Sequence, residues 1–454
     1  DIMSKNLIDT SPDSGPLVAT FFRFVIPSTL SLLAISTASV VDGFFVGNYI
    51  GAEALAAVNL LMPYFALLFG VALMFAVGGS VKASIYIGDK KYTLASSIFS
   101  QVFFVILAMA ALAVPLSLVF SEYLFAALGA TPSLYPLMQS YFEVFCFVTV
   151  VQLTCLVMYY FIRADNRPEL GMRALMLGAF VNVALDALFI GNLGWGIEGA
   201  AWATLIGQVI QLIYISSYFF SGRNSLKLSF PIFKIKQLGF IAFNGFSEFI
   251  NEFSIGLVIL VFHWVISRQS GIEGIAAFSV VNYLIYISLM VYYGIIDAMH
   301  VLLGQNFGAQ RLDRVKAFMR IAALSIAILS IVLVVILHVF EGPIIAFFLD
   351  DDAKNAQQLA QNFLHVIWPI FLFNGFNVLI CAYLTSAEQA MHSSIIAVLR
   401  SLILPIGFAL LLSIMLPDIG FLYAVPVAEA LAFVFAFIFY INYRPALLIK
   451  KSLK

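Results

Sequence analysis

The chain has 454 residues and a formal net charge of −1; 63% of the residues are hydrophobic and only 10% are charged. Its mean hydropathy is +1.03. A soluble core cannot hide that much apolar surface, so the composition excludes a soluble globular protein and indicates a polytopic membrane protein. The chain begins Asp-Ile-Met, and we expect Met3 to be the native start, with no cleavable signal peptide after it.

Twelve apolar runs are long enough to cross a bilayer as helices. In chain order they cover approximately residues 17–47, 56–86, 94–120, 135–162, 168–190, 198–220, 238–265, 276–304, 315–340, 357–384, 392–416 and 420–443. These runs are too long and too continuously apolar for the strands of a membrane barrel. The predicted fold is therefore an all-α polytopic membrane protein with twelve transmembrane helices.

The charges between the runs predict the orientation. The even-numbered gaps and the tail carry the basic residues Lys90, Lys91, Arg163, Arg167, Arg223, Lys227, Lys234, Lys236, Arg311, Arg314, Lys316, Arg444, Lys450, Lys451 and Lys454. The odd-numbered gaps carry Glu53, Glu122, Glu198, Glu273, Asp350 to Asp352 and Asp418, with only Arg268 and Lys354 as bases. Because Lys and Arg near helix ends stay cytoplasmic, we predict cytoplasmic termini and a place in the inner (cytoplasmic) membrane of the cell.

An internal repeat divides the chain into two lobes. Gly51-Ala-Glu-Ala-Leu-Ala-Ala reappears as Gly271-Ile-Glu-Gly-Ile-Ala-Ala, and Ile87-Gly88 reappears as Phe307-Gly308, at the same offset of 220 residues. Two lobes of six helices keep the same orientation, so we expect them to be related by an axis along the membrane normal. The predicted units are a cytoplasmic segment (1–16), an N-lobe (17–220), a cytoplasmic linker (221–236), a C-lobe (237–443) and a basic cytoplasmic tail (444–454).

Polar residues inside the first, fifth and sixth runs are the main functional signal. Asp42 stands fifteen residues after Pro27, about 22 Å along an α-helix. A charged Asp at mid-bilayer costs about 2.5 to 3.5 kcal/mol on insertion scales, and such residues usually mark ion pathways. Asn182 and Asp186 are spaced i, i+4 and share one helix face, and Thr204 follows in the next helix.

These four polar residues are confined to the N-lobe, because the repeat places Phe262, Phe408, Leu412 and Ala430 at the corresponding C-lobe positions. Carboxylate, amide and hydroxyl oxygens are hard donors that can hold a small monovalent cation such as Na⁺ or share a proton, and the residue types leave both open. In the structural alternative, Asn182 and Asp186 only tie helices together by hydrogen bonds.

Two stretches resemble the multidrug and toxic compound extrusion (MATE) transporters. One is Val41-Asp42-Gly-Phe-Phe-Val-Gly47 followed by Gly51-Ala-Glu-Ala-Leu-Ala-Ala-Val; the other is Gly304-Gln305-Asn306-Phe307-Gly308-Ala309-Gln-Arg311. The resemblance extends over essentially the whole chain. It implies a V-shaped cavity between the lobes and exchange of mostly cationic, polyaromatic or amphipathic drugs for H⁺ or Na⁺.

Within the family, the polar set is similar to the acid cluster of the DinF-like prokaryotic branch. This similarity implies that Asp42, Asn182, Asp186 and Thr204 bind the coupling proton or Na⁺, and that Pro27 is the hinge of the first helix. Proline breaks an i to i−4 hydrogen bond, which gives the helix a place to bend.

Further residues are weaker candidates. The seventh helix carries Glu248, Asn251 and Glu252. Since other MATE branches place a functional glutamate there, Glu252 is a candidate second coupling site, with a paired or solvated carboxylate as the alternative. Asp297 and His300 stand where many family members have Gln and Pro, and they are candidates to line the substrate cavity, although for His300 a satisfied interior histidine is the commoner outcome. Tyr159 and Met176 are further substrate-contact candidates.

We therefore predict a secondary active multidrug antiporter, without enzyme activity or cofactor. Its expected partners are small organic cations and the lipid bilayer, with no nucleic acid, and we expect a monomer. The main alternative is a lipid or lipid-linked oligosaccharide flippase of the related superfamily. An anionic cargo would call for Arg or Lys inside the helices, whereas here the basic residues lie at helix ends, apart from Arg23 and Arg400.

Two other classes fit the sequence less well. A major-facilitator transporter would carry an Asp-Arg pair in a basic loop after the second helix, where this chain has Ile-Gly-Asp-Lys-Lys. A membrane enzyme would need a nucleophile with a base, or a metal cluster. The histidines are instead scattered singly at His263, His300, His338, His365 and His392. The cysteines Cys146, Cys155 and Cys381 lie in apolar runs and are expected to be small buried hydrophobic side chains.

Overall fold

The computed structural model of the chain describes residues 11–349, 354–416, 420–445 and 447, and every regular element among them is helical. Within these residues, eleven helical segments are long and apolar enough to cross a membrane. A twelfth span is the pair α11 (Lys354–Ile367) and α12 (Ile370–Ser386), bent by 53° at its break. The prediction of twelve spans is confirmed. The acidic run Asp350 to Asp352, Asp418 and the lysines of the tail lie outside the described residues.

The first lobe contains α1 to α7. Their bounds are α1 Leu17–Phe45, α2 Ala52–Gly88, α3 Tyr92–Val119, α4 Ser121–Ala127, α5 Tyr135–Ala164, α6 Pro168–Asp186 and α7 Gly196–Phe220. Proline stands in the first turn of α5 and of α6, where its missing N–H costs nothing. Pro27 lies inside α1 and is buried. It therefore interrupts the hydrogen bonding of a helix that otherwise continues for 29 residues.

The second lobe contains α8 to α15. Their bounds are α8 Ile235–Gly308, α9 Leu312–Val339, α10 Glu341–Phe348, α11, α12, α13 Ala390–Val398, α14 Leu404–Met415 and α15 Gly420–Asn442. Within α8 the chain crosses twice, as spans Ile235–Gly271 and Glu273–Gly308. The sequence predicted a loop between residues 265 and 276, but the helix is broken only at Gly271, whose φ of 63° and ψ of −154° are not helical. Glycine has no Cβ, so a single residue can make this turn.

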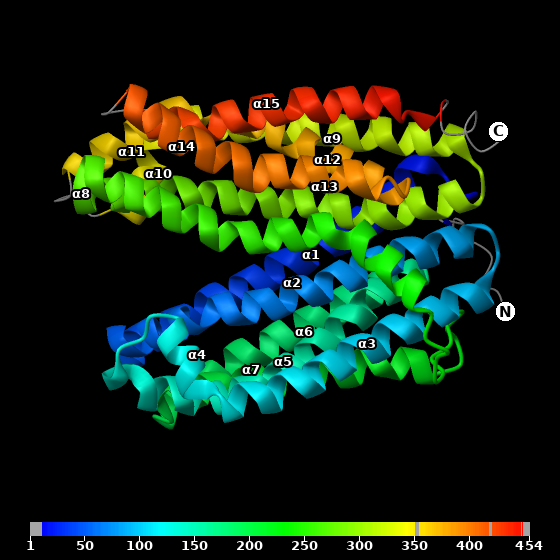
Figure 1. Cartoon of the computed structure of the whole chain (residues 1–454), viewed down its shortest axis with the longest axis horizontal. Helices are drawn as coiled ribbons and strands as arrows, with labels where there is room; N and C mark the ends of the chain where they lie inside the picture. Colours follow the sequence, from blue (N-terminus) through cyan, green and yellow to red (C-terminus); the bar gives the residue numbers. More distant parts are fainter. Residues whose placement is uncertain (1–10, 350–353, 417–419, 446, 448–454) are drawn as a thin grey trace.

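The two lobes lie side by side and form a V. Figure 1 shows α1 to α7 on one side and α8 to α15 on the other, with their ribbons close together at the end that carries both termini and diverging toward the opposite end. Residues 221–234 join the lobes without helix. This linker is held along α3, where the backbone N–H groups of Lys227 and Ser229 donate to the hydroxyls of Ser96 and Ser100, at 3.0 and 3.1 Å.

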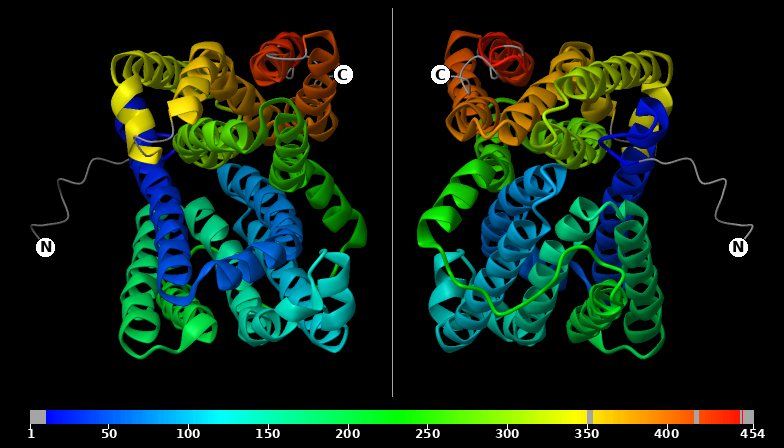
Figure 2. Two further views of the ribbon diagram at one scale, coloured as in Figure 1. Left: turned by 90° about the vertical axis from the view of Figure 1, so that its left-hand side faces the viewer. Right: turned by 90° about the vertical axis from the view of Figure 1, so that its right-hand side faces the viewer.

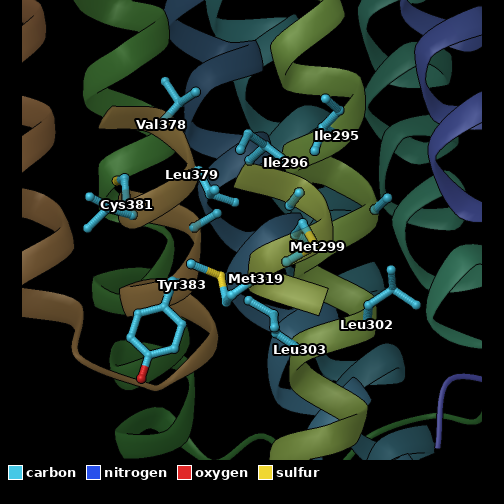
Figure 3. Packing of buried hydrophobic residues seen from close by; sticks show 14 of the residues in the cluster. Ile295, Ile296, Met299, Leu302, Leu303, Met319, Val378, Leu379, Cys381 and Tyr383 are labelled. Atoms are coloured by element: carbon cyan, nitrogen blue, oxygen red, sulfur yellow. The ribbon is translucent and has the colours of Figure 1, made fainter. Parts of the chain in front are cut away.

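Each lobe has its own apolar core. In the C-lobe, side chains of α8, α9 and α12 point toward one another, among them Met299, Met319 and Leu379 (Figure 3). This cluster also contains Phe21, Phe24 and Val25 of α1. Figure 2 shows α1, in dark blue, running from the C-lobe into the N-lobe. The first lobe predicted for residues 17–220 therefore lends the start of its first helix to the core of the other lobe.

The chain before α1 is tied to the same lobe. Arg314 donates from Nε to the carbonyl oxygen of Pro12 at 2.9 Å and from Nη2 to that of Gly15 at 2.7 Å. Asn306 donates to the Pro12 carbonyl at 3.0 Å. The beginning of α1 is thus fixed to α8 and α9 by both hydrogen bonds and apolar packing.

The lobes meet through glycine-rich faces of α2 and α8. A Cβ built at Gly88 would lie 1.9 Å from the carbonyl oxygen of Gln305, and one at Gly308 would lie 1.9 Å from that of Ile85. The repeat relates Gly88 to Gly308 and Ile85 to Gln305, each pair 220 residues apart, so the two contacts are symmetric between the lobes. A Cβ at Gly256, in the first span of α8, would meet nothing within 4 Å. Backbone contact between the lobes is therefore concentrated near the end that carries the termini.

Candidate ion-coupling site

Asp186 is the most deeply buried of the predicted site residues. It is the last residue of α6, its exposed fraction is 0%, and neither carboxylate oxygen has a hydrogen-bond partner among the described residues. A π-helical segment, Ala187–Asn192, follows it directly. Such segments widen the helix locally and often occur at functional sites. Burial without a hydrogen bond makes the charged form of Asp186 costly unless a cation accompanies it.

Asp42 approaches the same place from α1, which packs against α6. Its Oδ1 atom is buried and has no hydrogen-bond partner within the described chain, and the two carboxylates interact electrostatically. A second π-helical segment, Val46–Ile50, begins four residues after Asp42. Each of the two acids therefore precedes an irregular stretch of its own helix.

An amide and a hydroxyl complete the predicted set. Asn182, one turn before Asp186, donates from Nδ2 to Oγ1 of Thr204 on α7 at 3.2 Å. Thr204 in turn donates to the carbonyl oxygen of Ala200 at 3.0 Å. This pair connects α6 to α7, as the structural alternative expected. Asp186 takes no part in this hydrogen bond, so a role in joining helices explains Asn182 and Thr204 but not Asp186.

The sequence analysis missed Tyr141 of α5. Its side chain is 2% exposed, and it interacts electrostatically with both Asp42 and Asp186. Its ring stacks on Phe145 at a centroid separation of 4.9 Å. Tyrosine is common in apolar helices, so no signal in the sequence separated Tyr141 from the other tyrosines.

Together, these residues make a site of oxygen donors with two acids and no basic side chain in the set. The described residues contain no cluster of three or more His, Cys, Asp or Glu side chains suited to a metal ion. A Na⁺ ion would instead depend on the mixed set of Asp42, Asn182, Asp186 and Thr204, whose carboxylate, amide and hydroxyl oxygens are the donors that hard cations prefer. A proton needs only one of the two carboxylates.

A second buried polar cluster lies in the C-lobe, and its acid is paired. Arg400 lies 3.4 Å from Oε1 of Glu429, measured from Nη1, and Asn377 donates to Oε2 of Glu429 at 2.7 Å. Arg400 also donates to Oδ1 of Asn251 at 3.0 Å. Arg400 lies within a third π-helical segment, Leu399–Ile403. The sequence analysis noted Arg400 and Asn251 but missed their connection to Glu429.

Glu252 lies apart from the N-lobe set. It is partly buried on the first span of α8, and a Cβ built at Gly70 of α2 would lie 3.6 Å from its Cβ. It therefore stands where the two lobes face each other, while its neighbour Glu248 is buried closer to Arg400.

The candidate cavity residues divide into one exposed and three buried side chains. Met176 is 44% exposed, whereas Tyr159, Asp297 and His300 are 4%, 6% and 1% exposed. Asp297 forms an ion pair with Arg163, at 3.4 Å between Oδ2 and Nη1. The sequence analysis assigned Arg163 to a basic gap between helices, and that assignment was wrong: the side chain is in the last turn of α5 and 1% exposed.

Pro27 lies in a stretch of α1 where several hydroxyl side chains bond to the backbone of the same helix. The hydroxyls of Ser28 and Ser31 donate to the carbonyl oxygens four residues before them, at 2.8 and 2.7 Å. Ser36 and Thr37 do the same further along. Such bonds compete with the helical hydrogen bonds and favour bending. Combined with the proline, they make α1 a helix that can bend between its two ends.

A helical, two-lobed fold with an internal repeat and acids within the spans defines a membrane transporter of the V-shaped class. The MatE family profile matches residues 27–188 and 248–411, one match in each lobe, and the chain belongs to this family of transporters. The expectation drawn from the resemblance is thereby confirmed.

Three relatives show the extent of the likeness. Multidrug export protein MepA of Staphylococcus aureus (strain N315) is 22% identical over 422 residues, which is 92% of each chain. A MATE crystal structure in complex with MaL6 matches with a TM-score of 0.91 at 20% identity, covering 98% of this chain and 100% of that one. A MOP superfamily transporter from Pyrococcus furiosus, described by a binding pocket of reversed polarity that suggests a different function, matches with a TM-score of 0.88 at 20% identity over 98% and 99%.

Proposed function

We propose that this chain is a secondary active antiporter that exports cationic or amphipathic polyaromatic compounds in exchange for H⁺ or Na⁺. The observation that carries the proposal is the buried carboxylate of Asp186, without a hydrogen-bond partner among the described residues and next to a second acid, Asp42. A pair of buried acids without a basic partner calls for a proton or a small cation. MepA, a relative over most of the chain, is named a multidrug export protein, which favours drugs as the cargo.

Competition for negative charge would couple the ion to the drug. A cationic drug in the space between the lobes is attracted by the charged form of the acids. Binding of H⁺ or Na⁺ at Asp42 and Asp186 removes that attraction, so the drug is released when the ion arrives. A ligand shifts the balance between two conformations only by its different affinity for them, so this competition can drive exchange only if the lobes rearrange with it.

The first helix is suited to carry that rearrangement. Its beginning packs in the C-lobe core through Phe21 and Phe24, while Asp42 near its end lies in the N-lobe site. Pro27 stands between these two attachments. A bend at Pro27 would therefore change how one lobe stands relative to the other, which links the state of Asp42 to the opening of the V.

We place the end that carries the termini in the cytoplasm, because the basic residues gather there, and the protein in the inner membrane. The lobes in the present conformation would then diverge toward the outside. We propose that the chain works as a monomer, with each copy holding a complete ion site. Glu252, which faces α2 at the junction of the lobes, remains our candidate for a second coupling residue.

A flippase for anionic lipid-linked cargo is the second candidate, and one finding favours it. Arg163 and Arg400 are buried inside the helical region, 1% and 6% exposed, and the Pyrococcus furiosus relative is described by a pocket of reversed polarity. Each arginine is, however, paired with an acid, Asp297 or Glu429. Neither therefore presents a free positive charge to an anionic cargo, which leaves the antiporter as the better supported function.

Transport by purified protein in liposomes separates the two candidates. We expect efflux of ethidium, a planar organic cation, when a pH gradient alone or a Na⁺ gradient alone is imposed. Drive by the pH gradient identifies H⁺ as the coupling ion, and drive by the Na⁺ gradient identifies Na⁺. Absence of efflux under either gradient, together with movement of a fluorescent anionic lipid between leaflets, would support the flippase instead.

A further inference from the structure

The interface between the lobes contains a buried ion pair near the termini. Arg163 comes from the last turn of α5 in the N-lobe, and Asp297 comes from the second span of α8 in the C-lobe. Their side chains are 1% and 9% exposed, and Nη1 lies 3.4 Å from Oδ2. Tyr160 donates its hydroxyl to the other carboxylate oxygen at 3.2 Å. Both partners of Asp297 thus belong to the opposite lobe.

The surroundings make this contact specific. The guanidinium carbon of Arg163 lies 5.1 Å from the ring centre of Tyr159 and 5.4 Å from that of Tyr160, so two aromatic faces help to hold the cation. None of the guanidinium nitrogens has a well-aligned hydrogen-bond partner among the described residues. The same holds for both ring nitrogens of His300, one turn after Asp297. Arg163 is therefore held by charge and by aromatic rings.

The charges must stay together while they are buried. Removing one partner of a buried ion pair leaves an uncompensated charge in a medium of low dielectric constant, which is strongly unfavourable. The attraction also acts directly between the lobes, because each lobe supplies one of the two charges. At the same time the pair lacks the bidentate hydrogen bonds of the strongest arginine–carboxylate pairs. Such an ion pair can hold the two lobes together and still separate.

From this geometry we infer that the Arg163–Asp297 ion pair is a latch: it holds the lobes together at the end that carries the termini and must separate when the protein opens there. The inference goes beyond the proposed ion-coupling site and rests on that function only in requiring the lobes to part at this end. Breaking the pair by mutation shifts the protein toward the conformation that is open at this end.

A second ion pair between the lobes provides a matched control. Lys82 of α2 lies 2.7 Å from Oε1 of Glu388, measured from Nζ, and the two side chains are 19% and 29% exposed. Because solvent reaches both charges, such a pair contributes much less than a buried one. The substitution Lys82→Gln also removes a charge pair between the two lobes. Because this pair is partly exposed to solvent, its loss should leave the opening equilibrium almost unchanged.

The test follows the accessibility of Ser84, which is fully buried on α2 against Gly304 of α8. Cys146, Cys155 and Cys381 are first replaced by Ser, and Ser84→Cys is introduced as the reporter. Purified protein in nanodiscs is then labelled with a membrane-impermeant maleimide. We expect Asp297→Asn to raise the labelling rate at least about tenfold, because arginine cannot lose its proton and stays charged in the closed state. Arg163→Gln should raise it less, since Asp297 can take up a proton.

The double variant Arg163→Gln/Asp297→Asn separates charge from packing. It leaves no unpaired charge in the closed state but also removes the attraction between the lobes, so we expect a labelling rate below that of Asp297→Asn and above those of the parent and of Lys82→Gln. Monodisperse elution in size-exclusion chromatography shows that each variant is folded. The latch would be contradicted if both single variants labelled at the parent rate, or if the double variant labelled no faster than Lys82→Gln. Neither outcome depends on drug transport, so the latch and the antiport function can fail separately.

Discussion

The two lobes each bury a cluster of polar side chains, but only one cluster contains its own counter-charge. In the N-lobe, Asp42 and Asp186 interact with each other, and neither has a basic partner among the residues that the structure describes. In the C-lobe, Glu429 is matched by Arg400 and by the amide of Asn377. The charged form of the N-lobe acids would therefore need an external cation, whereas Glu429 already has Arg400 as its counter-charge. This difference suggests that the N-lobe carries the ion exchange and that the C-lobe cluster supports the structure.

The largest expected effect tests the structural half of this comparison. Glu429→Gln leaves Arg400 buried without its acid, and we expect a loss of about 3 to 5 kcal/mol of stability. We expect Asp186→Asn to raise the stability instead, because it removes a buried carboxylate that has no hydrogen-bond partner among the described residues. Thermal unfolding followed by size-exclusion chromatography checks both variants. A lower melting temperature for Asp186→Asn than for Glu429→Gln would mean that we have assigned the two clusters the wrong way round.

The next effect concerns transport. Asp42→Asn should lower ion-driven ethidium efflux about 100-fold, or about 2.8 kcal/mol at 1.4 kcal/mol per factor of ten, because the amide neither takes up a proton nor supplies charge to Na⁺. Initial rates in proteoliposomes measure it. Glu143→Gln, the same acid-to-amide exchange at an exposed position of α5, is the control for general effects of the substitution. Full efflux by Asp42→Asn would exclude Asp42 as the coupling residue.

A smaller effect is expected at the hinge. Pro27→Ala restores the helical hydrogen bond that proline cannot make, so α1 should bend less readily and exchange should slow about tenfold. Drug affinity should change less than twofold, because Pro27 lies far along the helix from Asp42. Pro63→Ala in α2 is a matched control, since it also removes a proline from within a helix. Equal slowing by both variants would show that no special role belongs to Pro27.

The smallest predicted effect comes from Thr204→Ala. It removes the hydroxyl that accepts a hydrogen bond from Asn182, a loss of about 0.5 to 1.5 kcal/mol. We expect a few-fold weaker response to the coupling ion, seen as a shift in the ion concentration that gives half-maximal efflux. If Na⁺ is the ion, Thr204→Ser should restore the response because it keeps the oxygen. An unchanged response in Thr204→Ala would remove Thr204 from the ion site.

The sequence predicted those features that depend on local pattern. Twelve spans follow from the length of the apolar runs, and Asn182, Asp186 and Thr204 were singled out as candidates because polar residues stand out in such runs. The hydrogen bond from Asn182 to Thr204 confirms that two of these residues meet. The 220-residue repeat related Gly88 to Gly308 in the sequence, and the structure shows that both make close contacts between α2 and α8.

Features that depend on distant contacts were not predictable from one sequence. Glu429 was not singled out, and Asp297 was expected to line the cavity, because their partners Arg400 and Arg163 come from other helices. The packing of Phe21 in the C-lobe core also contradicts what chain order suggests, since nothing in its apolar surroundings indicates which lobe it joins. The three π-helical segments likewise depend on packing that local propensity does not encode.

Direct competition between drug and ion is the measurement that tests the account most closely. Ethidium is bound to purified protein and followed by fluorescence anisotropy while protons or Na⁺ are added, with wild type and Asp42→Asn side by side. We predict that the coupling ion releases ethidium from the wild type, whereas Asp42→Asn still binds ethidium but no longer responds to the ion. Equal release from both proteins would contradict an exchange centred on the N-lobe acids.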